Sequence, residues 1–129
     1  MRIALNAQLL STTPTYRSAG ISRVVYELLA HLRAASSPEE QYVVYAPRSP
    51  ENRQFLRAAG LPARLTSLPT DRPPVRIAWE QLALPPELLR TGASLLHALG
   101  FVAPLAWRGP TVVTVYDLSF LRFPELFNR

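Results

Sequence analysis

Strand-like and helix-like patterns alternate along the whole chain, and this alternation constrains its fold more than any other feature. Apolar segments typical of strands lie near residues 2–8, 41–46, 63–68, 94–98 and 111–116. Stretches with helical spacing separate them, the clearest of which starts at Gly20 and carries an apolar residue every three or four positions. Such alternation predicts a parallel sheet with crossover helices on both faces. The expected fold class is therefore α/β, with a Rossmann-like sheet.

Local signals predict where several elements begin and end. Ser49 before Pro50 is typical of a helix N-cap, and Gly60 is a suitable residue just past that helix's end. A further helix is expected over residues 75–84. Pro85-Pro86 would end it, and one more helical turn would follow through Arg90. The β-branched residues 112–115 predict a buried parallel strand.

Length and composition favour one globular domain. The 129 residues are 48% hydrophobic and 18% charged, which suits a domain with a substantial core. No apolar run reaches the roughly 18 residues of a membrane span, and the N-terminus does not resemble a signal peptide. The absence of cysteine excludes disulfides and thiolate metal sites. We expect no cofactor and no metal, and a cytoplasmic location.

The basic charge consists entirely of arginine. All 14 basic residues are arginines, against 9 acidic residues, and the net charge is +5. They are spread along the chain without a block of neighbours, whereas a nucleic-acid footprint clusters them. We therefore expect no nucleic-acid partner, although single arginines could recognise phosphate.

Candidate site residues follow the predicted strands, where open α/β sheets bind their ligands. The segment Gly20-Ile21-Ser22-Arg23 starts a helix and offers free N–H groups to an anion. The alternative is a plain glycine at the start of a helix. Because the segment matches neither common phosphate-binding glycine pattern, both interpretations stay open.

Three further segments contain side chains that could take part in catalysis or ligand binding. His97, followed by Gly100-Phe101, could act as a base or hydrogen-bond a sugar, or could be structural. Tyr116-Asp117 ends the last strand, where Asp117 is either a site carboxylate or the cap of a turn. Glu80 could contact a hydroxylated ligand or belong to a solvated helix face.

The order of several segments resembles the N-terminal domain of family 4 (group 1) retaining glycosyltransferases. The resemblance covers essentially the whole chain, 1–129, and its specificity lies in the ordered set. The segments are Met1-Arg-Ile-Ala-Leu-Asn6, Gly20-Ile-Ser-Arg-Val-Val-Tyr-Glu-Leu-Leu29, Trp79-Glu-Gln-Leu-Ala-Leu-Pro85, Leu96-His-Ala-Leu-Gly100, Val112-Val-Thr-Val-Tyr-Asp-Leu118 and Phe123-Pro-Glu125.

The resemblance implies a GT-B enzyme, in which two Rossmann-like domains face each other across a cleft. This chain would be the acceptor side, and the donor-binding domain would be a second domain that is absent here. The partners implied are a nucleotide diphosphosugar donor and a carbohydrate or lipid-linked acceptor. A position at the inner face of the membrane is also consistent with the resemblance. We expect the chain alone to transfer no sugar, and exposed surface of an incomplete domain favours self-association.

The resemblance also implies roles for individual residues. Residues 20–23 match the glycine loop near the donor phosphates and the acceptor. His97 and Gly100-Phe101 match the loop that lines the acceptor side. Tyr116 stands where the family usually has a histidine that approaches the transferred sugar. A tyrosine there still donates a hydrogen bond but is no proton switch at neutral pH.

Two other functions compete with this interpretation. The chain could be a non-catalytic Rossmann-like module that binds or assembles a protein partner. It could also be an unrelated flavodoxin-like module that binds a nucleotide.

Overall fold

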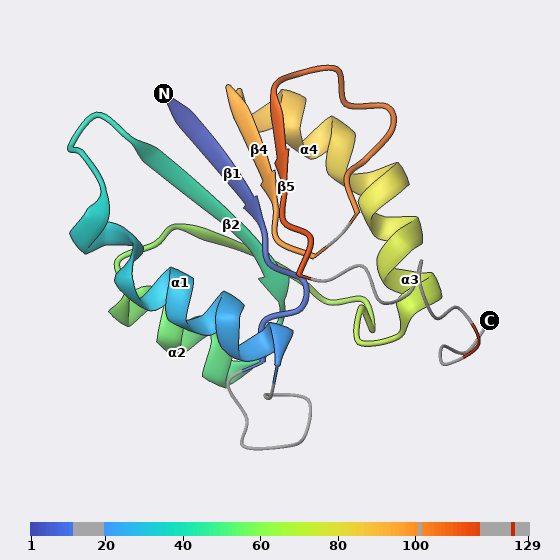
Figure 1. The fold of residues 1–129 in the computed structure, drawn as a ribbon, viewed down its shortest axis with the longest axis horizontal. Coiled ribbons are helices and arrows are strands. Elements are labelled where there is room, and N and C mark those ends of the chain that lie inside the picture. Colours follow the sequence, from blue (N-terminus) through green and yellow to red (C-terminus); the bar gives the residue numbers. More distant parts are fainter. Residues whose placement is uncertain (12–19, 101, 117–124, 126–129) are drawn as a thin grey trace.

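Five parallel strands form one sheet in the computed structural model, which describes residues 1–11, 20–100, 102–116 and 125 (Figure 1). The spatial order is β3-β2-β1-β4-β5, with every neighbouring pair parallel. The strands are β1 (Arg2–Asn6), β2 (Gln41–Pro47), β3 (Ala63–Thr66), β4 (Leu95–Ala98) and β5 (Thr111–Val113). The predicted α/β class and parallel sheet are confirmed.

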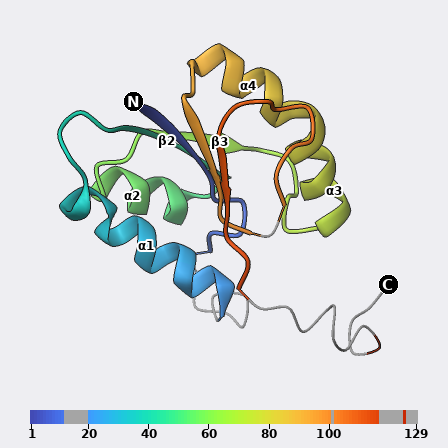
Figure 2. The same ribbon diagram turned by 45° about the horizontal axis from the view of Figure 1, so that its top comes forward.

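Helices cover both faces of the sheet, as predicted. Figure 2 shows the sheet between α1 (Ile21–Ala35) and α2 (Pro50–Ala58) on one side and α3 (Pro73–Ala78) and α4 (Leu84–Thr91) on the other. Each face has its own hydrophobic core, because successive residues of a strand point to opposite faces. On β1, Leu5 belongs to the α1–α2 core and Ala4 to the α3–α4 core.

The caps predicted for α2 are confirmed. The Ser49 hydroxyl accepts a hydrogen bond of 3.0 Å from the Asn52 N–H, and Pro50 is the first helical residue. Gly60 follows the helix end with a φ of +71°, a conformation that favours glycine.

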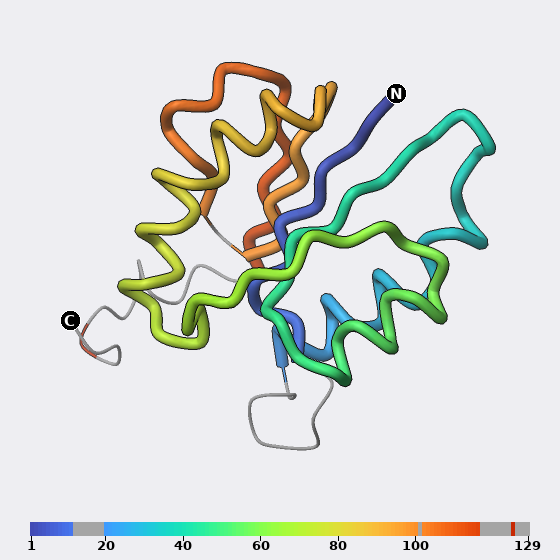
Figure 3. Tube along the Cα trace, turned by 180° about the vertical axis from the view of Figure 1, so that it is seen from behind, coloured from blue at the N-terminus to red at the C-terminus, as the bar shows by residue number. Residues whose placement is uncertain are grey.

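The helix before β4 differs from the prediction that Pro85-Pro86 would end it. A π-helical turn, η2 (Trp79–Ala83), joins α3 to α4, and Figure 3 shows one continuous rod. The Leu84 N–H bonds the Trp79 carbonyl five residues earlier. Both prolines then lie in the first turn of α4, where a missing N–H costs little, so the rod continues.

Three predicted strands end early, and one of them is not buried. β1 ends at Asn6 rather than residue 8, β3 at Thr66 rather than residue 68, and β5 at Val113 rather than residue 116. The prediction of a buried last strand is wrong: Val112 is 48% exposed and Val113 38%. The physical reason is position, because β5 is the outer strand beside β4. Within the described part of the chain, no helix has the length and apolar character needed to cross a lipid bilayer.

Candidate functional site

The carboxyl ends of β1, β4 and β5 lie close together. The Leu99 N–H donates to the Asn6 carbonyl at 3.2 Å, which links the end of β4 to the end of β1. The Thr114 N–H donates to the Ala98 carbonyl at 2.9 Å, which adds the end of β5. In an open parallel sheet this edge is where ligands bind.

His97 is half-buried near the end of β4. Its Nε2 lies 2.8 Å from the Thr114 hydroxyl, just past β5. Burial lowers the pKa of the imidazole, because removal from water disfavours the charged ring. Its neighbour Leu96 belongs to the α3–α4 core, so His97 points to the α1–α2 side of the sheet. The neutral ring is able to exchange hydrogen bonds with a hydroxylated ligand.

Tyr116 joins the chain past β5 to the chain past β4. Its hydroxyl donates to the Leu99 carbonyl at 2.6 Å. Burial raises the pKa of the phenol, so the group stays protonated and remains a donor at neutral pH. The structure therefore brings Tyr116 and His97 to the same β4–β5 end of the edge. Asp117 and Phe101 lie outside the described residues.

The residues at the start of α1, 20–22, differ in their exposure and in their contacts. Gly20 is exposed, has a φ of +63° and caps α1 without a side-chain hydrogen bond. Ser22 is buried, and its hydroxyl accepts a 3.0 Å bond from the Ser11 N–H. Ile21 packs against the α1–α2 core. Of these three residues, Gly20 alone is exposed.

Arg23 lies on the exposed surface of α1. Its guanidinium pairs with Glu27 one turn later at 2.8 Å and lies 5.5 Å from the centre of the Tyr26 ring. Gly100, in the loop after β4, is approached closely from the loop after β1. A Cβ at Gly100 would lie 2.5 Å from Leu9 Cδ1.

Glu80 is buried, so a solvated helix face is excluded. Its side chain comes from η2 on the α3–α4 side and accepts a 3.0 Å hydrogen bond from Asn6 Nδ2 at the end of β1. Arg76 Nε lies 3.9 Å from the same oxygen. Loss of water raises the pKa of Glu80, while Asn6 and Arg76 act to lower it.

The cluster of Asn6, Arg76 and Glu80 leaves three polar atoms without a hydrogen bond. Among the described residues, Asn6 Oδ1, Glu80 Oε2 and Arg76 Nε are buried and have no hydrogen-bond partner. Unsatisfied buried polar atoms are uncommon in folded proteins and require an explanation. They could pair with a bound water or a ligand hydroxyl at the end of β1.

Sequence reasoning missed a second buried polar cluster. Gln8 Nε2 donates to the Thr66 hydroxyl at 3.0 Å, and the Thr70 hydroxyl donates to Gln8 Oε1 at 2.8 Å. These contacts hold the loop after β1 against the loop after β3. Polar residues directly after an apolar strand, Asn6 and Gln8, were the signal that could have revealed both clusters.

Gln81 holds the long connection between β4 and β5. Its Nε2 donates to the Ala103 carbonyl at 3.1 Å, and its Oε1 accepts from the Leu105 N–H at 2.9 Å. Both ends of the amide are therefore used within the fold, next to buried Glu80.

The predicted residues thus occupy two sides of one sheet. His97 and Tyr116 lie near the ends of β4 and β5, whereas Glu80 contacts Asn6 on the α3–α4 side. The described residues contain no group of three or more His, Cys, Asp or Glu side chains able to hold a metal ion. Comparison with models of known families, with curated proteins and with solved structures finds no match.

Proposed function

We propose that this chain is the acceptor-binding, N-terminal domain of a nucleotide-sugar-dependent glycosyltransferase of the retaining GT-B type. One observation carries the proposal. Three of the ordered segments that resemble family 4 glycosyltransferases contain strands β1, β4 and β5 of one parallel sheet, and the described polar residues Asn6, His97 and Tyr116 lie at or just past the ends of these strands. Under this proposal, that edge of the sheet would face the cleft between the two domains.

The start of α1 would face the donor phosphates. Gly20 caps α1 without a side-chain hydrogen bond, and the backbone N–H groups at this helix N-terminus would bind an anion. Ser22 would position the loop through Ser11 rather than touch the substrate. A second domain would supply the nucleotide site.

The β4–β5 end would receive the acceptor. In the reaction, the acceptor oxygen forms a bond to the anomeric carbon while the bond from that carbon to the diphosphate oxygen breaks. The acceptor proton passes to the departing diphosphate, and configuration is retained. Neutral His97 would hydrogen-bond the sugar or acceptor hydroxyl, so catalysis would depend mainly on positioning and on stabilisation of the leaving diphosphate.

A non-catalytic binding module is the second candidate. It is favoured by the hydrogen bonds of Tyr116 to the Leu99 carbonyl and of His97 to Thr114, because both side chains already stabilise the loops at this edge.

The test is sugar transfer by the complete product of the gene that encodes this chain. A radiolabelled nucleotide-sugar assay with a broad acceptor panel is expected to show turnover, and the 129-residue chain alone is expected to show none. His97→Gln should lower transfer on the order of 100-fold, because it disturbs the position of the reacting hydroxyl. Tyr116→Phe should have a milder effect, because it removes one hydroxyl.

His31 provides the matched control. It is the other histidine of the chain, exposed on α1 beside Glu27. His31→Gln should leave transfer unchanged, and urea unfolding should show that His97→Gln still folds. Equal effects of both substitutions, or no turnover by the complete product, would favour the non-catalytic module.

A further inference from the structure

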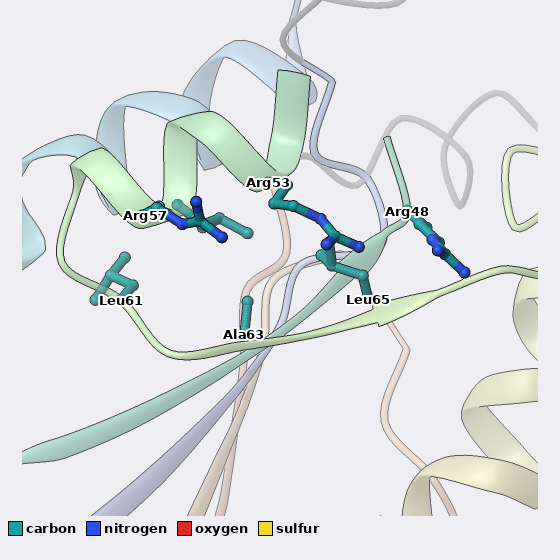
Figure 4. Close-up of a pocket in the computed structure, with 7 residues that line it drawn as sticks. Arg48, Arg53, Arg57, Leu61, Ala63 and Leu65 are labelled. Atoms are coloured by element: carbon teal, nitrogen blue, oxygen red, sulfur yellow. The ribbon is translucent and has the colours of Figure 1, made fainter. Parts of the chain in front are cut away.

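Three arginines surround one cavity at the β3 edge of the sheet. Arg48 follows β2, and Arg53 and Arg57 lie one turn apart on α2. Figure 4 shows the Arg53 and Arg57 side chains extending from α2 over β3, with Arg48 beyond Leu65. The cavity has a volume of about 540 Å³, within the range of small-molecule sites. Its remaining lining is apolar: Leu56, Leu61, Ala63 and Leu65.

The positive charge of this cavity is not neutralised by the protein. Within the described part of the chain, no carboxylate lies within ion-pairing distance of these three guanidinium groups, and no acidic residue lines the cavity. Four other arginines do pair with glutamates: Arg23, Arg64, Arg76 and Arg90. Three like charges around one cavity repel one another, and a bound anion would relieve this repulsion.

The arrangement favours a phosphate over a single carboxylate. A guanidinium offers a planar pair of donors that matches phosphate oxygens, and a phosphomonoester carries up to two negative charges for the three arginines. The leucines beside the arginines provide a surface for an apolar group attached to that phosphate. The concave shape favours a small molecule.

We propose that Arg48, Arg53 and Arg57 form a binding site for a small phosphomonoester whose apolar part contacts Leu61 and Leu65. The site lies beyond β2, whereas His97 and Tyr116 lie at the β4–β5 side, so it is a second site on the domain. This phosphomonoester site does not depend on the proposed glycosyl transfer, and either proposal can be wrong while the other is right.

Titration with phenyl phosphate tests this site. Nitrogen–proton NMR of the arginine side chains, at constant ionic strength, should show saturable shifts at Arg48, Arg53 and Arg57. Inorganic phosphate should shift the same signals but bind more weakly, because it lacks the apolar ring. Arg53→Gln and Arg57→Gln should each weaken phenyl phosphate binding by about tenfold.

Arg108→Gln is the matched control for net charge. Arg108 precedes β5 at the opposite edge of the sheet, and its substitution should leave the affinity unchanged. Urea unfolding checks that each variant folds, which is expected because all three cavity arginines are exposed.

The binding experiment is repeated with two other sources of negative charge. Phosphatidylcholine vesicles containing phosphatidic acid report on a membrane surface, and a polyglutamate peptide reports on an acidic protein segment. Arginine-dependent binding to either one, without saturable phenyl phosphate binding, would overturn the proposal. Unsaturable shifts, or equal weakening by Arg108→Gln, would also overturn it.

Discussion

Glu80 couples folding to pH because its carboxyl group is buried with incomplete pairing. Only 3% of the residue is exposed, and one carboxyl oxygen has no hydrogen-bond partner in the part of the chain that the structure describes. Burial raises its pKa in the native state. Below the ordinary pKa of a glutamate both folded and unfolded states are protonated, and no penalty exists. Between that ordinary pKa and the raised native pKa the unfolded state loses its proton first, so stability falls as pH rises, and above the native pKa the loss stays constant.

Glu80→Gln should therefore stabilise the protein increasingly as pH rises from 4 to 8. Glutamine keeps an oxygen that accepts from Asn6 Nδ2 but carries no charge. The measurement is the free energy of urea unfolding of both proteins across this range. Glu87→Gln, an exchange at a partly exposed surface pair with Arg64, is the control and should show no such trend. A difference that shrinks with rising pH would contradict the argument.

The sequence could identify some of these residues but not their surroundings. His97 and Tyr116 were found because each follows a strand-like run. Burial of Glu80 could not be foreseen, because its partner Asn6 is 74 positions away and helical periodicity did not predict the π-turn. The bond between Ser22 and Ser11 depends equally on tertiary packing.

At the scale of elements, η2 changes which side chains of the helical rod face the sheet. Leu84 and Leu88 are buried. In an uninterrupted α-helix the residue seven positions before Leu84, Ile77, would share their face. Instead Ile77 is 44% exposed, and Trp79 is buried with its ring 6.0 Å from that of Tyr45. The extra residue of the π-turn therefore turns Trp79 and Glu80 inward together.

Trp79→Ala should cost about 3–5 kcal/mol of unfolding free energy, because it removes a large buried ring. Ile77→Ala should cost less than about 1 kcal/mol, as expected for a side chain outside the core. Chemical denaturation of both variants measures these two losses of unfolding free energy. The reverse ranking would indicate a continuous α-helix through these residues.

Element boundaries were predictable where local chemistry sets them. The Ser49 cap, Pro50 and Gly60 fix α2 through bonds and backbone angles within a few residues. The prediction that Pro85-Pro86 would end the helix was wrong. A proline disfavours only the interior of a helix, and both prolines lie in the first turn of α4, directly after η2. Asn6, the last residue of β1, instead contacts Glu80 of η2, which lies far along the sequence.

At the scale of the whole molecule, strand order decides which apolar residues are buried. The alternation of patterns predicted a parallel sheet but not which strand lies at its edge. Among the described residues β5 pairs with β4 alone, so its outer backbone groups face away from the sheet. A parallel strand rich in valine is usually covered on both faces, yet Val112, Val113 and Val115 are each more than a third exposed.

An exposed edge of this kind favours association with a second copy of the chain. We expect the weight-average mass in sedimentation velocity to rise with protein concentration. Val112→Lys should hold the protein at the monomer mass, because a charged edge residue opposes strand pairing and removes apolar surface. Val24→Lys is the control: Val24 is 50% exposed, similar to Val112, but lies on α1 and cannot pair a strand. Monomer mass at every concentration in the unmodified chain, or equal loss of association in both variants, would show that β5 is not a contact surface.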